Sequence, residues 1–346
     1  MMREAFSCDD VLLVPRFSNL ESRSECDVSL GSYSLPIISS PMDTVYSKEL
    51  DRLLTKSNMI VTVHRYFKGF KEQIEAVGEA SSNDNRFFSV GSIPKSQEWI
   101  DGLLNLGIKH FLIDMAHGDS SACVRTIEYI KSKIGDGGKI IAGNVATKSG
   151  FRRLEEAGAW GVRVGLGSGS ICSTRQNTGF GVPLLTSVED CELVRDSAYI
   201  IADGGMKYPG DIAKAIACGA DFAMMGRMFA STDLGPGDCY DKNKELVCPY
   251  NEIDLGDNRS KVAYKHYRGM ASSEAREGVL KKASIEGVSG LVKYTGTTED
   301  FVENLSLNMK ASLSYAGSVN WKEFKRNTKK MHISSASLAE SGTHVE

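Results

Sequence analysis

One cysteine of the chain stands in a setting that suits a nucleophile. The run 165–172 reads Gly-Leu-Gly-Ser-Gly-Ser-Ile-Cys and ends at Cys172, with Ser173 and Thr174 directly after it. The thiolate is the reactive form of cysteine, and polar neighbours on an exposed loop favour it. We predict Cys172 as a nucleophile and Thr174 as a hydroxyl that passes a proton or orients a leaving group. The other seven cysteines show no Cys-x-x-Cys spacing and are interpreted as reduced, buried thiols.

Glycines that follow two apolar runs predict a phosphate site. Asp203-Gly204-Gly205 and Gly226-Arg227 each come directly after such a run. Without a Cβ, glycine lets phosphate oxygens approach backbone amides, and Ser170 would add a hydroxyl. Asp203 would accept from ribose hydroxyls, because a carboxylate repels phosphate. The alternative is that these glycines only make tight turns.

A second set of polar residues predicts a second ligand. Asp114 and Asn144 each follow an apolar run on the side of the predicted mouth opposite the phosphate loops, so a dinucleotide-sized molecule could lie there. His64 is interpreted as satisfying a hydrogen bond at this mouth. For His117 both that role and contact with the second ligand stay open.

The elements that would position these residues repeat along the chain. Eight short apolar runs, separated by segments of helical periodicity such as 120–134, 150–157 and 209–219, predict parallel strands joined by crossover helices. The predicted strands are Leu35-Ile38, Met59-Val63, Phe87-Val90, His110-Ile113, Lys139-Ala142, Trp160-Val164, Tyr199-Ala202 and Phe222-Met225. Eight such units close a (β/α)8 barrel, whose strands end on the face that carries the chemistry. A Rossmann fold is disfavoured, because no Gly-x-Gly-x-x-Gly opens the chain.

The sequence predicts a single domain over residues 1–330. The segment 231–298 lacks apolar periodicity and is longer than an ordinary connection between two elements, so we predict that it forms a mobile flap. Residues 299–328 return to helical patterning, and 331–346 are expected to form a flexible tail.

Composition excludes several classes of function. The 346 residues carry 41 Lys and Arg against 44 Asp and Glu, a net charge of −3, so a nucleic-acid surface has no support. No apolar run approaches the roughly 20 residues that cross a bilayer, and no signal pattern opens the chain, so a cytoplasmic location is expected.

Motifs along nearly the whole predicted barrel resemble the IMP dehydrogenase/GMP reductase family. They are Asp9-Asp10-Val-Leu-Leu-Val-Pro15, Ser39-Ser40-Pro-Met-Asp-Thr-Val45, Asp114-x-Ala-His-Gly118, Ile141-Ala-Gly-Asn-Val-Ala-Thr147, Gly165-x-Gly-Ser-Gly-Ser-Ile-Cys172, Ala202-Asp-Gly-Gly205, Met224-Met-Gly226 and Tyr267-Arg-Gly-Met270. The resemblance implies a (β/α)8 barrel, a homotetramer, a purine nucleoside monophosphate and a nicotinamide dinucleotide. It also implies a cysteine thiolate that adds to purine C2 while hydride passes between C2 and the nicotinamide.

Carried over by motif, the resemblance assigns roles to individual residues. Cys172 would be the nucleophile, with Thr174 beside the purine. The phosphate, ribose and base would contact Ser40, Met42, Gly169, Ser170, Asp203, Gly205, Gly226, Arg227, Tyr267, Gly269 and Met270. The dinucleotide would contact Asp114, Ala116, His117, Asn144 and Arg163. A potassium ion would bind carbonyls of Gly167, Gly169 and Cys172. Arg227 departs from the small residue usual beside the phosphate, so it would either contact the phosphate directly or indicate a modified substrate.

The reaction that fits best is that of a GMP reductase with NADPH. Between Val63 and Phe87 there is no room for the regulatory domains of the dehydrogenases, and between Met270 and Gly287 there is no Arg-Tyr pair to activate water. Glu274 is the candidate proton donor, one position later than in the reductase pattern.

Other readings stay open. His117, Tyr267-Arg-Gly-Met270 and Glu286-Gly-Val-Ser-Gly290 look more like dehydrogenase motifs. An IMP dehydrogenase that uses NAD without a regulatory domain is therefore the alternative. A purine nucleotide sensor without turnover and a barrel adapted to a deoxynucleotide are further alternatives.

Overall fold

Eight parallel strands form a closed barrel. The computed structural model describes residues 3–78, 85–249, 255–269 and 287–341. In the order around the barrel the strands are β2 (Ile37–Ser39), β9 (Phe222–Met225), β8 (Tyr199–Asp203), β7 (Gly161–Val164), β6 (Lys139–Val145), β5 (His110–Asp114), β4 (Arg86–Val90) and β3 (Val61–Val63). All eight predicted strands and the (β/α)8 class are confirmed. β2 and β3 begin two residues later than predicted.

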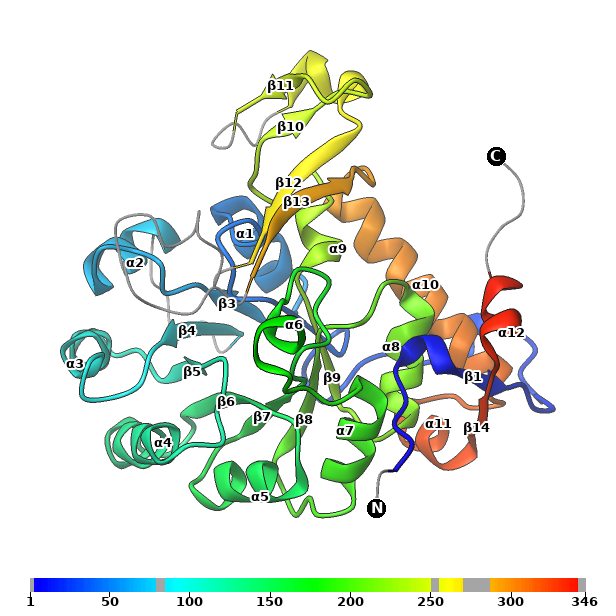
Figure 1. Ribbon diagram of the computed structural model, residues 1–346, viewed down its shortest axis with the longest axis horizontal. Helices are drawn as coiled ribbons and strands as arrows, with labels where there is room; N and C mark the ends of the chain where they lie inside the picture. Colours follow the sequence, from blue (N-terminus) through cyan, green and yellow to red (C-terminus); the bar gives the residue numbers. More distant parts are fainter. Residues whose placement is uncertain (1–2, 79–84, 250–254, 270–286, 342–346) are drawn as a thin grey trace.

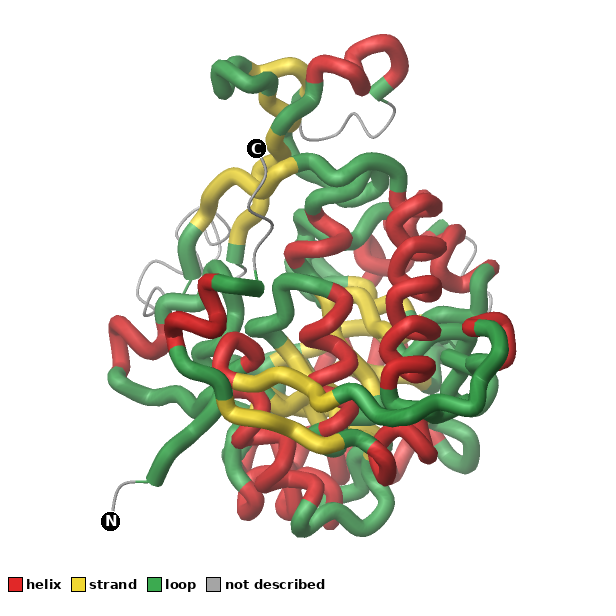
Figure 2. Tube along the Cα trace, turned by 90° about the vertical axis from the view of Figure 1, so that its right-hand side faces the viewer, coloured by secondary structure: helices red, strands yellow, loops and turns green. Residues whose placement is uncertain are grey.

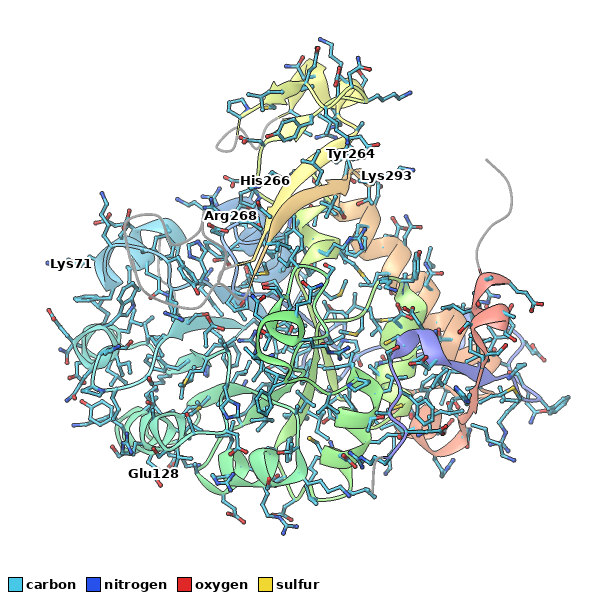
Figure 3. All side chains as sticks on the ribbon, viewed as in Figure 1. Lys71, Glu128, Tyr264, His266, Arg268 and Lys293 are labelled. Atoms are coloured by element: carbon cyan, nitrogen blue, oxygen red, sulfur yellow. The ribbon has the colours of Figure 1, made fainter. Side chains whose placement is uncertain are left out.

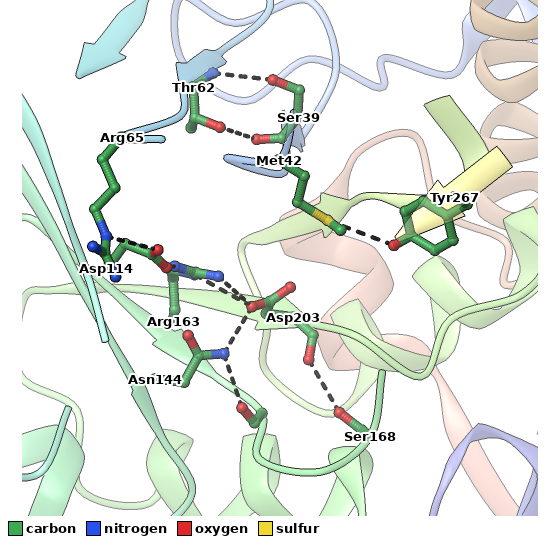
Figure 4. Close-up of polar contacts among 11 residues, drawn as sticks. Ser39, Met42, Thr62, Arg65, Asp114, Asn144, Arg163, Ser168, Asp203 and Tyr267 are labelled. Carbon is green, nitrogen blue, oxygen red and sulfur yellow. Dashed lines mark hydrogen bonds and ion pairs between the residues drawn. The ribbon is translucent and has the colours of Figure 1, made fainter. Parts of the chain in front are cut away.

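The barrel closes where β2 meets β3, with side chains completing the seam. Ile38 and Ile60 form a single parallel bridge. Beyond it the Thr62 amide donates to Oγ of Ser39 at 3.0 Å, and the Thr62 hydroxyl donates to the Ser39 carbonyl at 2.5 Å (Figure 4). Polar side chains thus supplement the backbone hydrogen bond from the Ser39 amide to the Ile60 carbonyl, 3.2 Å long, at the shortest strand pair of the barrel.

Alternate strand residues fill the barrel, and the others pack under helices. Phe87, Leu112, Ile141 and Ile201 come from four different strands, yet they belong to one buried cluster, which is possible only across the barrel interior. The surrounding helices are α1 (Lys48–Lys56), α2 (Phe70–Val77), α3 (Gln97–Asn105), α4 (Ser121–Ile134), α5 (Lys148–Glu156), α7 (Leu184–Glu192), α8 (Pro209–Ala217) and α10 (Thr298–Tyr315). Within the described residues, helices long and apolar enough to cross a bilayer are absent.

The predicted flap contains a sheet. β10 (Cys239–Tyr240), β11 (Leu246–Cys248), β12 (Tyr264–Arg268) and β13 (Ser289–Lys293) pair antiparallel in the order β11-β10-β12-β13. The sheet rises above the barrel beside α9 (Arg227–Ala230), and the 3-10 helix η3 (Gly256–Lys261) lies between β11 and β12 in the chain (Figure 1). The apolar pattern missed it because the strands are short and a lysine takes an inward position of β12.

The two ends of the chain meet on the outside of the barrel. β1 (Val11–Val14) pairs antiparallel with β14 (Lys329–His332), which follows α11 (Trp321–Asn327) and precedes α12 (Ser335–Ala339) (Figure 2). The 3-10 helices η1 (Cys8–Asp10) and η2 (Arg23–Glu25) flank β1. The boundary predicted between residues 330 and 331 falls inside β14. The reason is that backbone pairing with β1 recruits an exposed, lysine-rich segment that carries no apolar signal.

Candidate active site

Loops after the barrel strands enclose two adjoining cavities at one end of the barrel. Cavity A is lined by Ser40 and Met42 after β2, by 168–172 after β7, by 204–207 after β8, by Gly226 and Arg227 after β9, and by Tyr267, Gly269 and Gly287 of the flap region. Cavity B is lined by Arg65 and Tyr66 after β3, by 114–116 at the end of β5, by Asn144 of β6 and Arg163 of β7, and by 165–169, Cys172 and Thr174. The predicted convergence of strand ends thus brings residues far apart in sequence to one place.

Cys172 lies at the junction and lines both cavities. The side chain is only partly buried, unlike those of the other seven cysteines, and its Sγ lies 3.1 Å from Oγ1 of Thr174. The Cys172 amide donates to the Gly169 carbonyl at 3.0 Å, which turns the loop just before the short helix α6 (Thr174–Thr178). A thiol on this turn can face a ligand in either cavity.

The flap is hydrogen-bonded to the cysteine loop. The Val288 amide donates to the Ile171 carbonyl at 3.0 Å, and the Gly269 amide donates to the Val288 carbonyl at 3.0 Å. Cys172 and Gly287 form an antiparallel bridge. The loop that carries the thiol is therefore held by a segment more than a hundred residues further along the chain.

Two glycines of cavity A are required by their surroundings. Gly205 has a φ of +74°, in the left-handed region that favours glycine. A Cβ on Gly226 would come within 2.6 Å of the Tyr267 hydroxyl and 3.1 Å of the Met42 sulfur. Both residues were predicted to contact a phosphate, and both lie on the cavity wall beside Arg227.

Arg163 joins two carboxylates between the cavities. Its Nη1 donates to Asp114 at 2.8 Å, and its Nη2 donates to Asp203 at 2.8 Å (Figure 4). Arg65 adds a second ion pair to Asp114 at 3.2 Å. Burial opposes ionisation of Asp114, but the charges of Arg163 and Arg65 outweigh it and hold the pKa of Asp114 below its usual value. These side chains form one charged network between the cavities.

Asp203 has one carboxylate oxygen engaged by this network. Its Oδ2 accepts from Arg163 and, at 2.7 Å, from Nδ2 of Asn144, which also donates to the Gly165 carbonyl at 2.9 Å. Among the described residues, no hydrogen bond falls on Oδ1 of Asp203, so this atom can accept from a ligand in cavity A. The sequence predicts Asp203 beside one ligand and Asn144 beside the other, whereas the structure links the two side chains by a direct hydrogen bond.

Some predicted residues lie elsewhere. His117 is exposed and lines neither cavity, while its neighbour Ala116 lines cavity B. His64 is buried: its Nδ1 accepts from the Tyr66 amide at 3.2 Å, and its ring stacks on Phe67 at 4.2 Å. Burial lowers the pKa of His64 to about 4, so the ring is neutral near pH 7. This matches the interpretation of His64 as a hydrogen-bonded residue at the barrel mouth.

Other predicted residues cannot be placed or stay predictions. Met270 and Glu274 lie outside the described residues. Gly167 lines cavity B, and the Gly169 carbonyl already accepts from Cys172. Among the described residues no three His, Cys, Asp or Glu side chains gather as metal ligands, a finding that does not test a site made of carbonyls. The potassium site therefore stays a prediction.

Sequence reasoning missed four polar residues of the site, among them Tyr66, which lines cavity B. Arg65 lines cavity B, Lys207 lines cavity A, and Ser168 lines both, with its hydroxyl donating to the Asp203 carbonyl at 3.2 Å. The signal was present, because each residue stands within a few positions of a predicted strand end.

Comparison with known proteins decides the family. The model of the IMP dehydrogenase / GMP reductase domain matches residues 5–344. The chain belongs to this family. A GMP reductase of Mesoplasma florum is 35% identical over 330 residues, which cover 93% of this chain and 96% of the relative. A GMP reductase of Bacillus thuringiensis is 33% identical and covers 92% of each chain.

The matched relatives also include a protein named as a dehydrogenase. The inosine-5'-monophosphate dehydrogenase of Chlorobaculum parvum is 40% identical over 261 residues, which cover 71% of this chain but only 49% of the relative. Identity alone therefore does not choose between the two reactions.

Proposed function

We propose that the protein is a GMP reductase, which converts GMP, NADPH and a proton to IMP, NADP+ and ammonia. The observation that carries the proposal is the position of the Cys172 thiol, partly exposed at the junction of two cavities. A reaction that needs a nucleophile between a nucleotide and a hydride donor requires this arrangement.

Cavity A has the groups that a purine monophosphate needs. The phosphate of the nucleotide would lie against the backbone of Gly205 and Gly226. The cationic side chains of Arg227 and Lys207, which line the same cavity, would complement the phosphate charge. The free oxygen of Asp203 would accept from the ribose, and the purine would extend toward Cys172. The Cys172 thiolate adds to purine C2, and the C2–N bond breaks as one proton reaches the leaving nitrogen, which departs as ammonia. The Thr174 hydroxyl beside the sulfur relays this proton.

Cavity B fits a nicotinamide nucleotide. It combines the Asn144 amide, the Tyr66 ring and the glycine-lined wall 165–169, and it also reaches Cys172. When NADPH is bound, it supplies the hydride to C2. Arg163 and Asp114 hold the Asp203 carboxylate in place between the two ligands. After the hydride reaches C2, the C2–S bond breaks and the Cys172 thiolate is regenerated.

Two features favour the reductase. The relatives named GMP reductase align over more than nine-tenths of the chain. The segment between β3 and β4 holds α2 and no inserted domain pair in its described residues. The second candidate is an IMP dehydrogenase that uses NAD, and the 40% identity over the matched part of a dehydrogenase favours it.

One spectrophotometric experiment separates the two reactions. Purified full-length protein is mixed with GMP and NADPH, and in parallel with IMP and NAD, each with and without potassium chloride. The proposal expects loss of reduced-nicotinamide absorbance and release of ammonia in the first mixture. A gain of absorbance in the mixture with IMP and NAD, with no change in the mixture with GMP and NADPH, supports the dehydrogenase. Nucleotide binding without turnover in either mixture supports a sensor. Light scattering on the same sample tests the proposed homotetramer.

A further inference from the structure

A lysine of the flap is buried in a cage of carbonyl oxygens. Lys265 lies on β12 with only 2% of its surface exposed. Its Nζ donates to the carbonyls of Thr232 at 2.7 Å, of Asp233 at 3.3 Å, and of Gly235. A buried charge is costly unless hydrogen bonds compensate it, so the cage is what allows an ammonium here.

The cage lies where the flap leaves the barrel and returns to it. Residues 232–235 follow α9, at the start of the flap. The Asp233 amide donates to the Gly296 carbonyl at 3.1 Å, and the Thr295 amide donates to the Ser231 carbonyl at 2.9 Å. The Thr298 hydroxyl and amide both donate to Oδ1 of Asp233. Lys265 is thus attached to the base that holds both ends of the flap.

The same strand carries a residue of cavity A. Side chains alternate along a strand, so Lys265 and Tyr267 share the inward face of β12 and both are buried. Tyr264, His266 and Arg268 alternate with them on the other face (Figure 3). The Tyr267 hydroxyl lies 3.6 Å from the Met42 sulfur and beside Gly226. Two residues of extended strand span only about 7 Å, so an anchor at 265 fixes the place of 267.

We propose that Lys265 is a positioning residue, whose caged ammonium holds β12 so that Tyr267 forms the wall of cavity A against the bound nucleotide. The choice of nucleotide rests on the proposed function, whereas the anchoring of β12 does not. Burial lowers the pKa of Lys265, and the charge of Asp233 partly counters that effect.

The test combines truncation with chemical rescue. Lys265→Ala removes three methylenes and the ammonium, a group that propylammonium reproduces. GMP binding is measured by calorimetry, and amide hydrogen exchange is measured on peptides that contain 264–268. Lys293→Ala is the matched control, because Lys293 is an exposed lysine of the same sheet (Figure 3).

We expect Lys265→Ala to weaken GMP binding at least about tenfold, since a charge-assisted set of hydrogen bonds is lost. Exchange at 264–268 should rise in the same variant. Propylammonium chloride should restore both properties, and tetramethylammonium chloride, which has no N–H donor, should restore neither. Lys265→Met keeps the apolar stem and is expected to show the same losses without rescue. Lys293→Ala should behave as the wild type.

Three results would overturn the inference. They are unchanged GMP binding in Lys265→Ala, lost binding that propylammonium cannot restore, and unchanged exchange at 264–268. If the wild type binds no purine nucleotide, the proposed function fails, and the exchange measurement alone then decides the role of Lys265. If Lys265→Ala does not fold, Lys265→Met decides by the same two measurements.

Discussion

Sγ of Cys172 lies 3.1 Å from Oγ1 of Thr174; Thr174 lines cavity B, and Cys172 lines both cavities. The two residues are separated by Ser173 alone, and the helix α6 begins at Thr174. We therefore expect Cys172 to bond to the ligand and Thr174 to move a proton.

Replacing Cys172 by alanine should abolish turnover and spare nucleotide binding. Removal of a covalent nucleophile costs roughly 10⁴-fold or more in rate, because no other group takes its place. Rates and calorimetric GMP affinities are measured on the same preparation. Cys26→Ser is the control, since the Cys26 sulfur is buried 3.7 Å from the Ser318 carbonyl and the residue lines neither cavity. An alanine variant that still turns over would exclude covalent catalysis.

Replacing Thr174 by valine should slow the reaction roughly 10²-fold or more at unchanged GMP affinity. Valine keeps the shape of threonine and removes the only hydroxyl that the structure shows hydrogen-bonded to the sulfur among the described residues. Thr174→Ser keeps the hydroxyl and should retain most of the rate. Equal rates in the valine and serine variants would contradict a role in proton transfer.

Replacing Arg227 by serine should weaken GMP binding about tenfold and leave guanosine binding unchanged. The exposed side chain lines the glycine-rich end of cavity A, so its charge should act on the phosphate. The loss should shrink at high salt, which screens exposed charges. Arg152→Ser, on the exposed face of α5, controls for net charge. An equal loss for guanosine would show that Arg227 acts on the base or the fold.

Protonation of His64 should reduce stability in acid. Burial lowers the pKa of His64 to about 4, below the usual value of about 6.5. Between these pH values the unfolded chain binds a proton that the folded chain does not, so the free energy of unfolding falls as the pH falls. The effect of this residue is about 3 kcal/mol over that window.

Denaturant unfolding between pH 7 and pH 4 measures this effect. His64→Asn should flatten the pH dependence, whereas His117→Asn, which changes an exposed histidine, should keep the wild-type slope. Equal slopes in all three proteins would mean that another group controls acid stability.

The sequence by itself determined the barrel and most of the site's membership. Eight apolar runs at crossover spacing admit few other folds, and in a barrel a residue that follows a strand must lie at the active face. The structure brings Asp114, Asn144, Cys172 and Asp203, each predicted at a strand end, to one end of the barrel.

Only the tertiary structure decided how these groups are paired. Arg163 pairs with Asp203, which is 40 positions away in the chain, and with Asp114, which is 49 positions away. The hydrogen bond from the Val288 amide to the Ile171 carbonyl joins the flap to the cysteine loop. β14 forms because it meets β1, and Lys265 is buried because three carbonyls meet its ammonium. Such partners are set by packing in space, whereas periodicity reports only which residues avoid water along one element. A lysine in a core position is therefore visible only when the structure shows what surrounds it.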